Sequence, residues 1–231
     1  MTDDLTDEPT GDLAVRAAHL AEEAHAGQLR KGTEVPYFDG HLQPVAQLVA
    51  ESGGSDVQVA AAYLHDAVED AGGPAMLMRI AHDLGPEVRE IVEHLSDSVL
   101  DTTDGAKKES WATRKPRYLA GLADAPVAAL EVSVADKVHN AESILDDHES
   151  LGSAVWAQFG EQRPEYQLWY YSSLDAVFRE RIADHPLTGR LTRVVTALAD
   201  RIRAEMPDID RKVAEVAAAF ASGPDDEDER G

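Results

Sequence analysis

The chain has 231 residues, no cysteine and a formal net charge of −23, with 44 acidic against 21 basic side chains. The absence of cysteine excludes a disulfide framework and a thiolate metal site. The negative charge argues against a nucleic-acid partner, which needs a basic surface, although a metal ion and a few local cations can still attract a nucleotide. No apolar run approaches transmembrane length and the acidic start of the chain is unlike a signal peptide, so we expect a cytoplasmic protein with no membrane partner.

Apolar residues recur at helical spacing along most of the chain, and no stretch alternates with period two for long enough to predict a sheet. Asp12 and Asp56 are predicted to cap the first and third helices, and Gly or Pro separates most of the others. The sequence therefore predicts an all-α fold. The predicted helices are 12–28, 41–51, 57–70, 74–85, 86–94, 107–122, 126–146, 165–183, 187–205 and 209–221.

The domain organisation predicted from this pattern is simple. Residues 12–222 form one domain with a C-terminal helical extension, because no convincing linker or internal repeat interrupts them. A chain of this length is ample for one helical core. The acidic ends, 1–11 and 223–231, are predicted to be disordered, since they carry too few apolar residues to pack.

The most informative segment is His65-Asp66-Ala67-Val68-Glu69-Asp70, inside the predicted helix 57–70. Residues four apart share a face of a helix, so His65 is expected above Glu69 and Asp66 above Asp70. Four such groups beside an apolar face cost free energy unless they are paired. A metal ion held by His65 and Asp66, with the acidic pair acting on a water molecule, would explain them.

A second His-Asp pair, His82-Asp83, provides a comparison within the same chain. It precedes Leu84-Gly85-Pro86, which is a helix stop, and no acidic pair follows four residues later. We interpret it as a solvated helix end. By itself, the pair His65-Asp66 also fits a local hydrogen-bonded pair without a metal. Further motifs in the chain are needed to distinguish this alternative from a metal-binding pair.

Two further motifs flank this segment. Upstream, Arg30-Lys31 precedes Pro36-Tyr37 and then His41; downstream, Ala135-Asp136-Lys137-Val138-His139-Asn140 lies in a helical pattern. A divalent cation needs more than two protein ligands, and mixed histidine and carboxylate donors suit Mn, Fe, Co or Zn.

In this order, His41, His65-Asp66 and Asp136 resemble the metal signature of the HD-domain phosphohydrolases. With the other motifs, roughly residues 17 to 146 are similar to the hydrolase domain of RelA/SpoT-type alarmone enzymes, above all its small stand-alone members. The resemblance implies a compact multi-helix HD-domain fold and one divalent metal, with Mn²⁺ the favoured ion. The implied metal ligands are His41, His65, Asp66 and Asp136.

The resemblance also implies roles for other residues and a reaction. Glu69 and Asp70 would be catalytic, and the substrate-binding residues would be Arg30, Lys31, Lys137 and Asn140. The implied substrate is guanosine 3′,5′-bis(diphosphate), which is hydrolysed to GDP and pyrophosphate. The chain departs from the family pattern in a turn before His41 that is one residue longer, and in Glu142, where the family often has a base.

Two alternatives remain open at this point. One is an HD phosphohydrolase that acts on another nucleotide: a deoxynucleotide, a nucleoside monophosphate or a 2′-phosphorylated dinucleotide. The other is a non-catalytic regulator that binds the alarmone. The presence of Glu69 and Asp70 favours an enzyme, since a binding module has no need of a pair that activates water. The sequence leaves the oligomeric state open.

Overall fold

The computed structural model describes residues 11–98 and 109–222, which are mainly helical. Within these ranges the β pairing is limited to one isolated bridge, between Leu29 and Pro36, so the all-α prediction is confirmed. The chain divides into two compact units. One contains the described residues up to Glu109 together with Ala125–Asp136, and the other contains Ser110–Asp124 and the chain from Lys137 onward.

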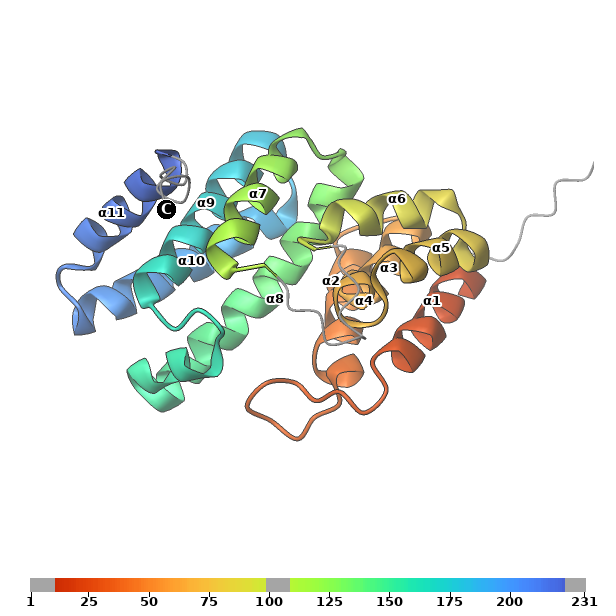
Figure 1. The fold of residues 1–231 in the computed structure, drawn as a ribbon, viewed down its shortest axis with the longest axis horizontal. Coiled ribbons are helices and arrows are strands. Elements are labelled where there is room, and N and C mark those ends of the chain that lie inside the picture. The colour runs from red at the N-terminus through yellow and green to blue at the C-terminus, as the bar shows by residue number, and fades with distance from the viewer. Residues whose placement is uncertain (1–10, 99–108, 223–231) are drawn as a thin grey trace, which may run out of the picture. The chain divides into compact units, whose positions relative to one another are not determined.

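The first unit is built around α3, Asp56–Tyr63, which packs against α1, α2 and α6 (Figure 1). Ala60, Ala61 and Ala62 of α3 are fully buried, and their small side chains allow the neighbouring helices to approach closely. The other elements of this unit are α1 (Gly11–Ala24), η1 (Phe38–Leu42), α2 (Gln43–Glu51), α4 (Ala67–Asp70), α5 (Gly73–Leu84), α6 (Pro86–Leu95) and the beginning of α8 (Val127–Leu151).

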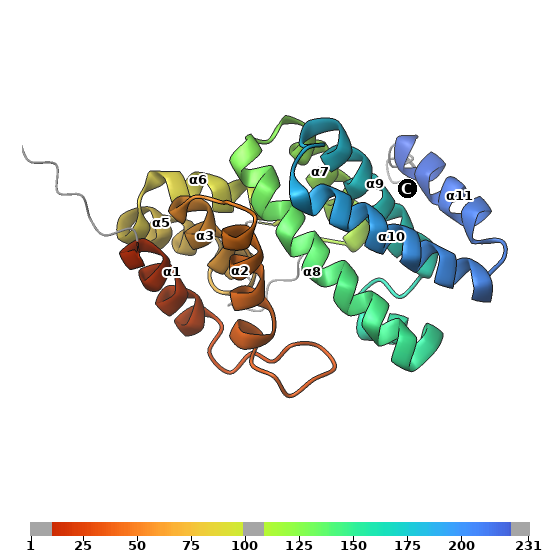
Figure 2. The ribbon, with the colours of Figure 1, turned by 180° about the vertical axis from the view of Figure 1, so that it is seen from behind.

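The second unit is centred on α9, Pro164–Arg181, which packs against α7, α10 and α11 (Figure 2). Its core contains Leu174 and Phe178 of α9, both fully buried, and Leu191 and Leu198 of α10. The remaining elements are α7 (Trp111–Asp124), the rest of α8, η2 (Gly152–Gln158), α10 (Pro186–Glu205) and α11 (Ile209–Ala221).

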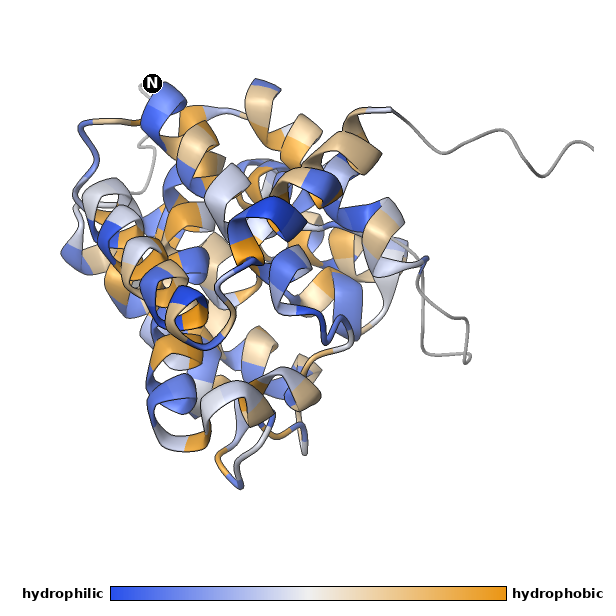
Figure 3. Ribbon diagram, turned by 90° about the vertical axis from the view of Figure 1, so that its left-hand side faces the viewer, coloured by the Kyte–Doolittle hydropathy of each residue, from blue (hydrophilic) through white to orange (hydrophobic). Residues whose placement is uncertain are grey.

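Hydrophobic and hydrophilic residues alternate along the helices (Figure 3), as expected where one face is buried. None of the helices in the described residues is long and apolar enough to cross a membrane. The predicted disordered ends, 1–11 and 223–231, lie outside the described residues, apart from Gly11, which begins α1. The domain boundaries predicted from the sequence stay a prediction.

Several predicted helix boundaries need correction. The first helix ends at Ala24 and not near Gln28. The cap of α3 is Ser55, not Asp56: its hydroxyl accepts a hydrogen bond from the backbone of Gln58, whose side chain bonds back to the backbone of Ser55. This reciprocal pair is a capping box, which satisfies two backbone donors at the start of the helix.

The predicted helix 57–70 is in fact two helices, and this is the correction that matters most for the site. Helix α3 ends at Tyr63 and α4 begins at Ala67. The side chain of His65 explains the break: its Nδ1 lies 2.7 Å from the carbonyl oxygen of Ala62. In a continuous helix that carbonyl would accept the backbone N–H of Asp66. His65 and Asp66 therefore lie in a turn, so the prediction of one continuous helix is wrong. The backbone N–H of Asp70 still bonds to the carbonyl of Asp66, one helical turn earlier.

Candidate metal centre

The break between α3 and α4 points His65 and Asp66 toward a third residue, His41, which lies in η1. This element is a π-helical turn, in which the backbone N–H of Gln43 bonds to the carbonyl of Phe38, five residues earlier. A π-turn accommodates one extra residue within a helix, and such turns are frequent at functional sites. The π-turn includes Gly40 and His41, in the stretch that the sequence predicts to be one residue longer than in the family; the extra length stays a prediction.

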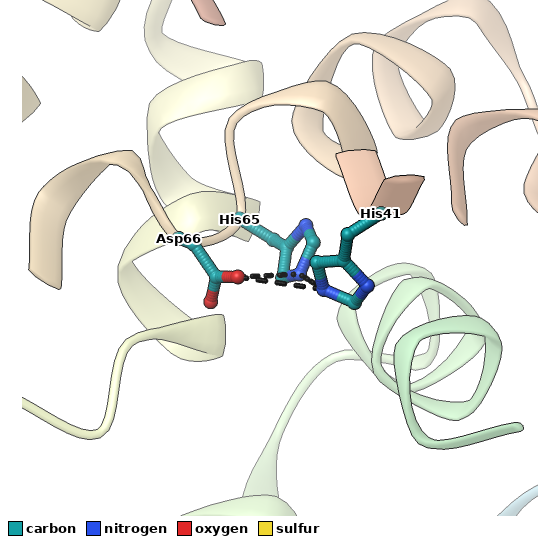
Figure 4. A group of neighbouring side chains, drawn as sticks. All are labelled: His41, His65 and Asp66. Carbon is teal, nitrogen blue, oxygen red and sulfur yellow. Dashed lines mark hydrogen bonds and ion pairs between the residues drawn. The ribbon is translucent and has the colours of Figure 1, made fainter. Parts of the chain in front are cut away.

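The side chains of His41, His65 and Asp66 converge on one point (Figure 4). The two Nε2 atoms lie 3.1 Å apart, and Oδ2 of Asp66 lies 3.5 Å from Nε2 of His41 and 3.2 Å from Nε2 of His65. Asp136, from α8, adds Oδ1 at 3.3 Å and 3.5 Å from the same two nitrogens. All four predicted metal ligands thus meet in one cluster.

The chemistry of this cluster fits a cation at its centre. Because a backbone carbonyl only accepts hydrogen bonds, Nδ1 of His65 carries a hydrogen when it bonds to Ala62. The lone pair on Nε2 of an uncharged His65 then faces the two carboxylates. Acceptors facing acceptors in a buried place repel one another unless a positive charge lies between them.

Burial and charge both act on the cluster. His41, His65 and Asp136 are 1%, 4% and 6% exposed. Burial alone would lower the pKa of His65, but the charges of Asp66 and Asp136 raise it well above its ordinary value. Burial would raise the pKa of Asp66, yet the two histidines hold it well below the usual range. The carboxylates therefore favour positive charge at this point, whether it comes from a proton or from a metal ion.

Tyr37, which was not among the predicted site residues, contacts the cluster: its ring centre lies 5.1 Å from that of His41. Its hydroxyl donates a 2.5 Å hydrogen bond to Oδ2 of Asp66. Burial and the charge of Asp66 raise the pKa of Tyr37 far above its ordinary value, so the hydroxyl keeps its proton and remains a donor. Bonds of this kind orient a metal ligand. Its place in the Pro36-Tyr37 turn, a few residues before His41, puts Tyr37 close to the site in the sequence but does not show which ligand it contacts.

The predicted catalytic pair follows the cluster at the end of α4. Oε1 of Glu69 accepts a hydrogen bond of 2.8 Å from the backbone N–H of Asp97, which fixes one of its oxygens. Asp70 is exposed, and its Oδ2 accepts a 3.1 Å bond from the side-chain amide of Gln28. The two carboxylates are thus held differently, with Glu69 the more enclosed.

The predicted substrate-binding residues Arg30 and Lys31 begin a tight loop. The backbone of Arg30 bonds to Val35 and Thr33, which closes the loop. A side chain in place of Gly40 would come within 3.1 Å of Val35 and 3.3 Å of Arg30, so Gly40 lets this loop pack against η1. The loop that carries the two cations is therefore packed on the element that carries His41.

The other two predicted substrate-binding residues, Lys137 and Asn140, lie on α8 in the second unit. The ammonium of Lys137 is 5.0 Å from the centre of the Tyr118 ring, within the range of a cation–π contact. Glu142, the residue that departs from the family pattern, is paired with Arg190 of α10 through bonds of 2.6 and 2.8 Å. Arg190 therefore offsets the negative charge of Glu142.

A helical scaffold with two buried imidazoles and two carboxylates around one point defines a candidate metal-binding protein. Comparison with protein families gives the class: residues 17–163 match the family described as HD domain. This match covers more than half of the chain, so the protein belongs to the HD-domain family. The resemblance seen in the sequence is confirmed.

The chain is also similar to individual proteins. The chain is 34% identical over 135 residues to a probable GTP pyrophosphokinase of Mycobacterium leprae, an alignment that covers 57% of this chain and 16% of that protein. It is 32% identical over 135 residues to a probable guanosine-3′,5′-bis(diphosphate) 3′-pyrophosphohydrolase of a Synechocystis strain, covering 57% of this chain and 17% of the relative. The chain thus spans only about a sixth of the length of these two relatives.

Among solved structures, one described as a metazoan orthologue of SpoT that hydrolyses ppGpp matches with a TM-score of 0.61. The match covers 79% of this chain and 93% of that one, at 19% sequence identity. A likeness at this level of identity establishes a common fold.

Proposed function

We propose that this protein is a metal-dependent phosphohydrolase that cleaves guanosine 3′,5′-bis(diphosphate) to GDP and pyrophosphate. The observation that carries the proposal is the convergence of four side chains, those of His41, His65, Asp66 and Asp136. Glu69 and Asp70 lie only three and four residues after Asp66 in the chain. The relatives are named for both synthesis and hydrolysis of such nucleotides. Two carboxylates near a candidate metal centre, Glu69 and Asp70, support hydrolysis, because such groups can act as a general base on water.

The donor set suits one divalent ion with mixed nitrogen and oxygen ligands, and we propose Mn²⁺. The four ligating atoms would be Nε2 of His41, Nε2 of His65, Oδ2 of Asp66 and Oδ1 of Asp136. When bound, such an ion lowers the pKa of water and offsets charge on a phosphate oxygen.

In the proposed reaction the protein's own residues handle the water and its proton. The exposed carboxylate of Asp70 accepts a proton from the attacking water, while Glu69, fixed through Asp97, orients that water. The water oxygen bonds to the phosphorus on the ribose 3′ oxygen, and the bond between that phosphorus and the 3′ oxygen breaks. The 3′ oxygen takes up a proton, so that GDP and pyrophosphate leave.

Binding of the polyanionic substrate is assigned to Arg30, Lys31, Lys137 and Asn140. Positioning and charge stabilisation account for most of the catalysis in phosphoryl transfer. Local cations matter more here than in most proteins, because the chain as a whole carries a net charge of −23. A cytoplasmic location fits this role and stays a prediction.

The decisive experiment incubates the purified protein with Mn²⁺ and a panel of nucleotides. We expect equal amounts of GDP and pyrophosphate from guanosine 3′,5′-bis(diphosphate), and none of either after chelation of the metal. If phosphate is released from another nucleotide and no pyrophosphate from the alarmone, the protein is still a metal-dependent phosphohydrolase. The alarmone is then excluded as its substrate. Tight binding of the alarmone without turnover would instead identify a regulator.

A further inference from the structure

Gln28 joins two residues that are far apart in the sequence, His25 and Asp70. Its Oε1 lies 2.7 Å from Nδ1 of His25, and its Nε2 donates a 3.1 Å bond to Oδ2 of Asp70. His25 follows the end of α1, and Asp70 is the last residue of α4. The contact therefore ties the start of the unit to the proposed proton acceptor.

The direction of these bonds follows from the chemistry of the groups. A carboxylate only accepts hydrogen bonds, so the amide nitrogen of Gln28 must face Asp70 and its oxygen must face His25. Nδ1 of His25 therefore carries a hydrogen. The opposite orientation of the amide would place its oxygen against the carboxylate of Asp70, where two acceptors would face each other. Asp70 thus selects the orientation of the amide, and the Nδ1–H of His25, which is 4% exposed, donates to the Gln28 oxygen in that orientation.

Asp70 lies on an element that does little to fix its own position. Helix α4 has only four residues, and the side chain of Asp66 at its start makes no capping bond. After α4, Gly72 and Gly73 have φ angles of 131° and 51°, which allow the chain to turn away. So short a helix is not stable by itself, and tertiary contacts must set its orientation.

The segment that carries Gln28 also supports the metal cluster. The carbonyl of Gln28 accepts a 2.8 Å bond from the backbone N–H of Tyr37, whose hydroxyl holds Asp66. The ring of His25 packs against the ring of Tyr37, with centres 5.3 Å apart. One segment therefore holds a candidate metal ligand through Tyr37 and the proposed proton acceptor through Gln28.

From this arrangement we infer that Gln28, anchored by a hydrogen bond from His25, is a positioning residue that aims the carboxylate of Asp70 at the attacking water. The inference rests on the proposed function. Gln28 thus has a role in catalysis without contact with the reacting atoms, and His25 holds the Gln28 side chain in place through its oxygen.

The test replaces Gln28 with methionine, which has a similar size and cannot make either bond. Because a hydrogen bond to a charged group contributes about 1.5–3 kcal/mol, we expect kcat to fall about 10- to 100-fold. KM, Mn²⁺ affinity and melting temperature should remain near those of the wild type. Gln47→Met is the matched control, since Gln47 also donates to a carboxylate, that of Glu51, at 2.7 Å on the exposed surface. This variant should have the activity of the wild type.

A double-mutant cycle separates positioning from a general loss of structure. In an Asp70→Asn background, Gln28→Met should cost little more activity, because the group it positions is already inactive. The variant Gln28→Asn should also be less active, because the shorter side chain cannot reach both His25 and Asp70. Independent losses that multiply in the double variant would overturn the inference, and so would a rise in KM with unchanged kcat.

A measurement without turnover distinguishes failure of this inference from failure of the proposed function. In NMR spectra of the wild type we expect a slowly exchanging Nδ1 proton of His25 and a shift of the Gln28 side-chain amide in Asp70→Ala. Gln28→Met should abolish the His25 signal. A protein that hydrolyses no nucleotide but has these signals would refute the proposed function and retain the contact; an Nδ1 signal unchanged in Gln28→Met would refute the contact itself.

Discussion

The hydroxyl of Tyr37 donates a hydrogen bond of 2.5 Å to Oδ2 of Asp66, the same oxygen that faces both imidazoles of the candidate metal centre. The residue thus orients a ligand that lies in a turn and not in a helix. Partners of this kind typically change metal affinity by about 10- to 100-fold when they are removed.

We therefore predict that Tyr37→Phe lowers Mn²⁺ affinity by about 10- to 100-fold while the protein stays folded. Isothermal titration with Mn²⁺ would measure it. Tyr63→Phe is a suitable control, because the Tyr63 ring stacks on Phe38 and the change leaves that contact in place. Equal affinities for the wild type and Tyr37→Phe would mean that the bond to Asp66 does not affect the metal.

Metal binding should stabilise the fold, because the ion relieves repulsion among buried acceptors. At a free Mn²⁺ concentration about 100 times the Kd, the stabilisation is about 2.7 kcal/mol if the unfolded chain does not bind the ion. We expect a higher melting temperature with Mn²⁺ and a lower one after chelation. Asp136→Ala should remove most of this difference in melting temperature. Elemental analysis should also find less bound metal in this variant. An unchanged Mn²⁺ affinity would exclude Asp136 as a ligand.

The acidic pair should be essential for turnover and dispensable for folding. We predict that Glu69→Gln and Asp70→Asn lower kcat by about 10²- to 10⁴-fold, the usual contribution of a general base. Glutamine at position 69 can still accept the bond from Asp97, so thermal stability should be kept. Asp83→Asn, in the exposed His82-Asp83 pair, is the control and should be nearly silent. Unfolding of the Glu69 or Asp70 variant would make the pair structural.

The ion pair of Glu142 with Arg190 changes what is expected of the departure from the family pattern. Glu142→Arg would place two guanidinium groups together, so we predict a destabilisation of about 1 kcal/mol and no gain in substrate affinity. The double exchange Glu142→Arg with Arg190→Glu should restore stability. Urea denaturation of the wild type, the two single variants and the double variant gives the coupling free energy between the two residues. A lower KM for Glu142→Arg alone would show that Glu142 faces the substrate.

Acid should weaken the start of α9 through Glu161. Hydrogen bonds from the Arg163 side chain lower the pKa of Glu161, so its contribution is complete above the unfolded pKa, about 4.3, and is lost as pH falls through the folded pKa. Because Arg163 is half exposed, the contribution is about 1 kcal/mol or less. Urea denaturation should find the wild type more stable than Glu161→Gln at pH 7, with a smaller gap at pH 3.5. An equal difference in stability at the two pH values would show that the ion pair of Glu161 with Arg163 does not cause the pH dependence.

The sequence by itself determined the helical class, most of the helices and the residues of the candidate metal centre. Helical periodicity and the Gly and Pro stops are local signals, so α5, α6, α10 and α11 begin and end close to their predicted bounds. The identities and order of His41, His65-Asp66 and Asp136 were enough to predict the four residues that the fold brings together.

Only the tertiary structure decided how those residues are held. The sequence favoured a continuous helix through His65, because periodicity cannot register that its side chain takes the carbonyl of Ala62 from the helix. It could not select Tyr37 or Gln28 either, since each becomes significant through a partner, Asp66 or Asp70, more than 25 residues away. Local propensity determines where helices form, whereas contacts between distant side chains orient the groups that bind and react.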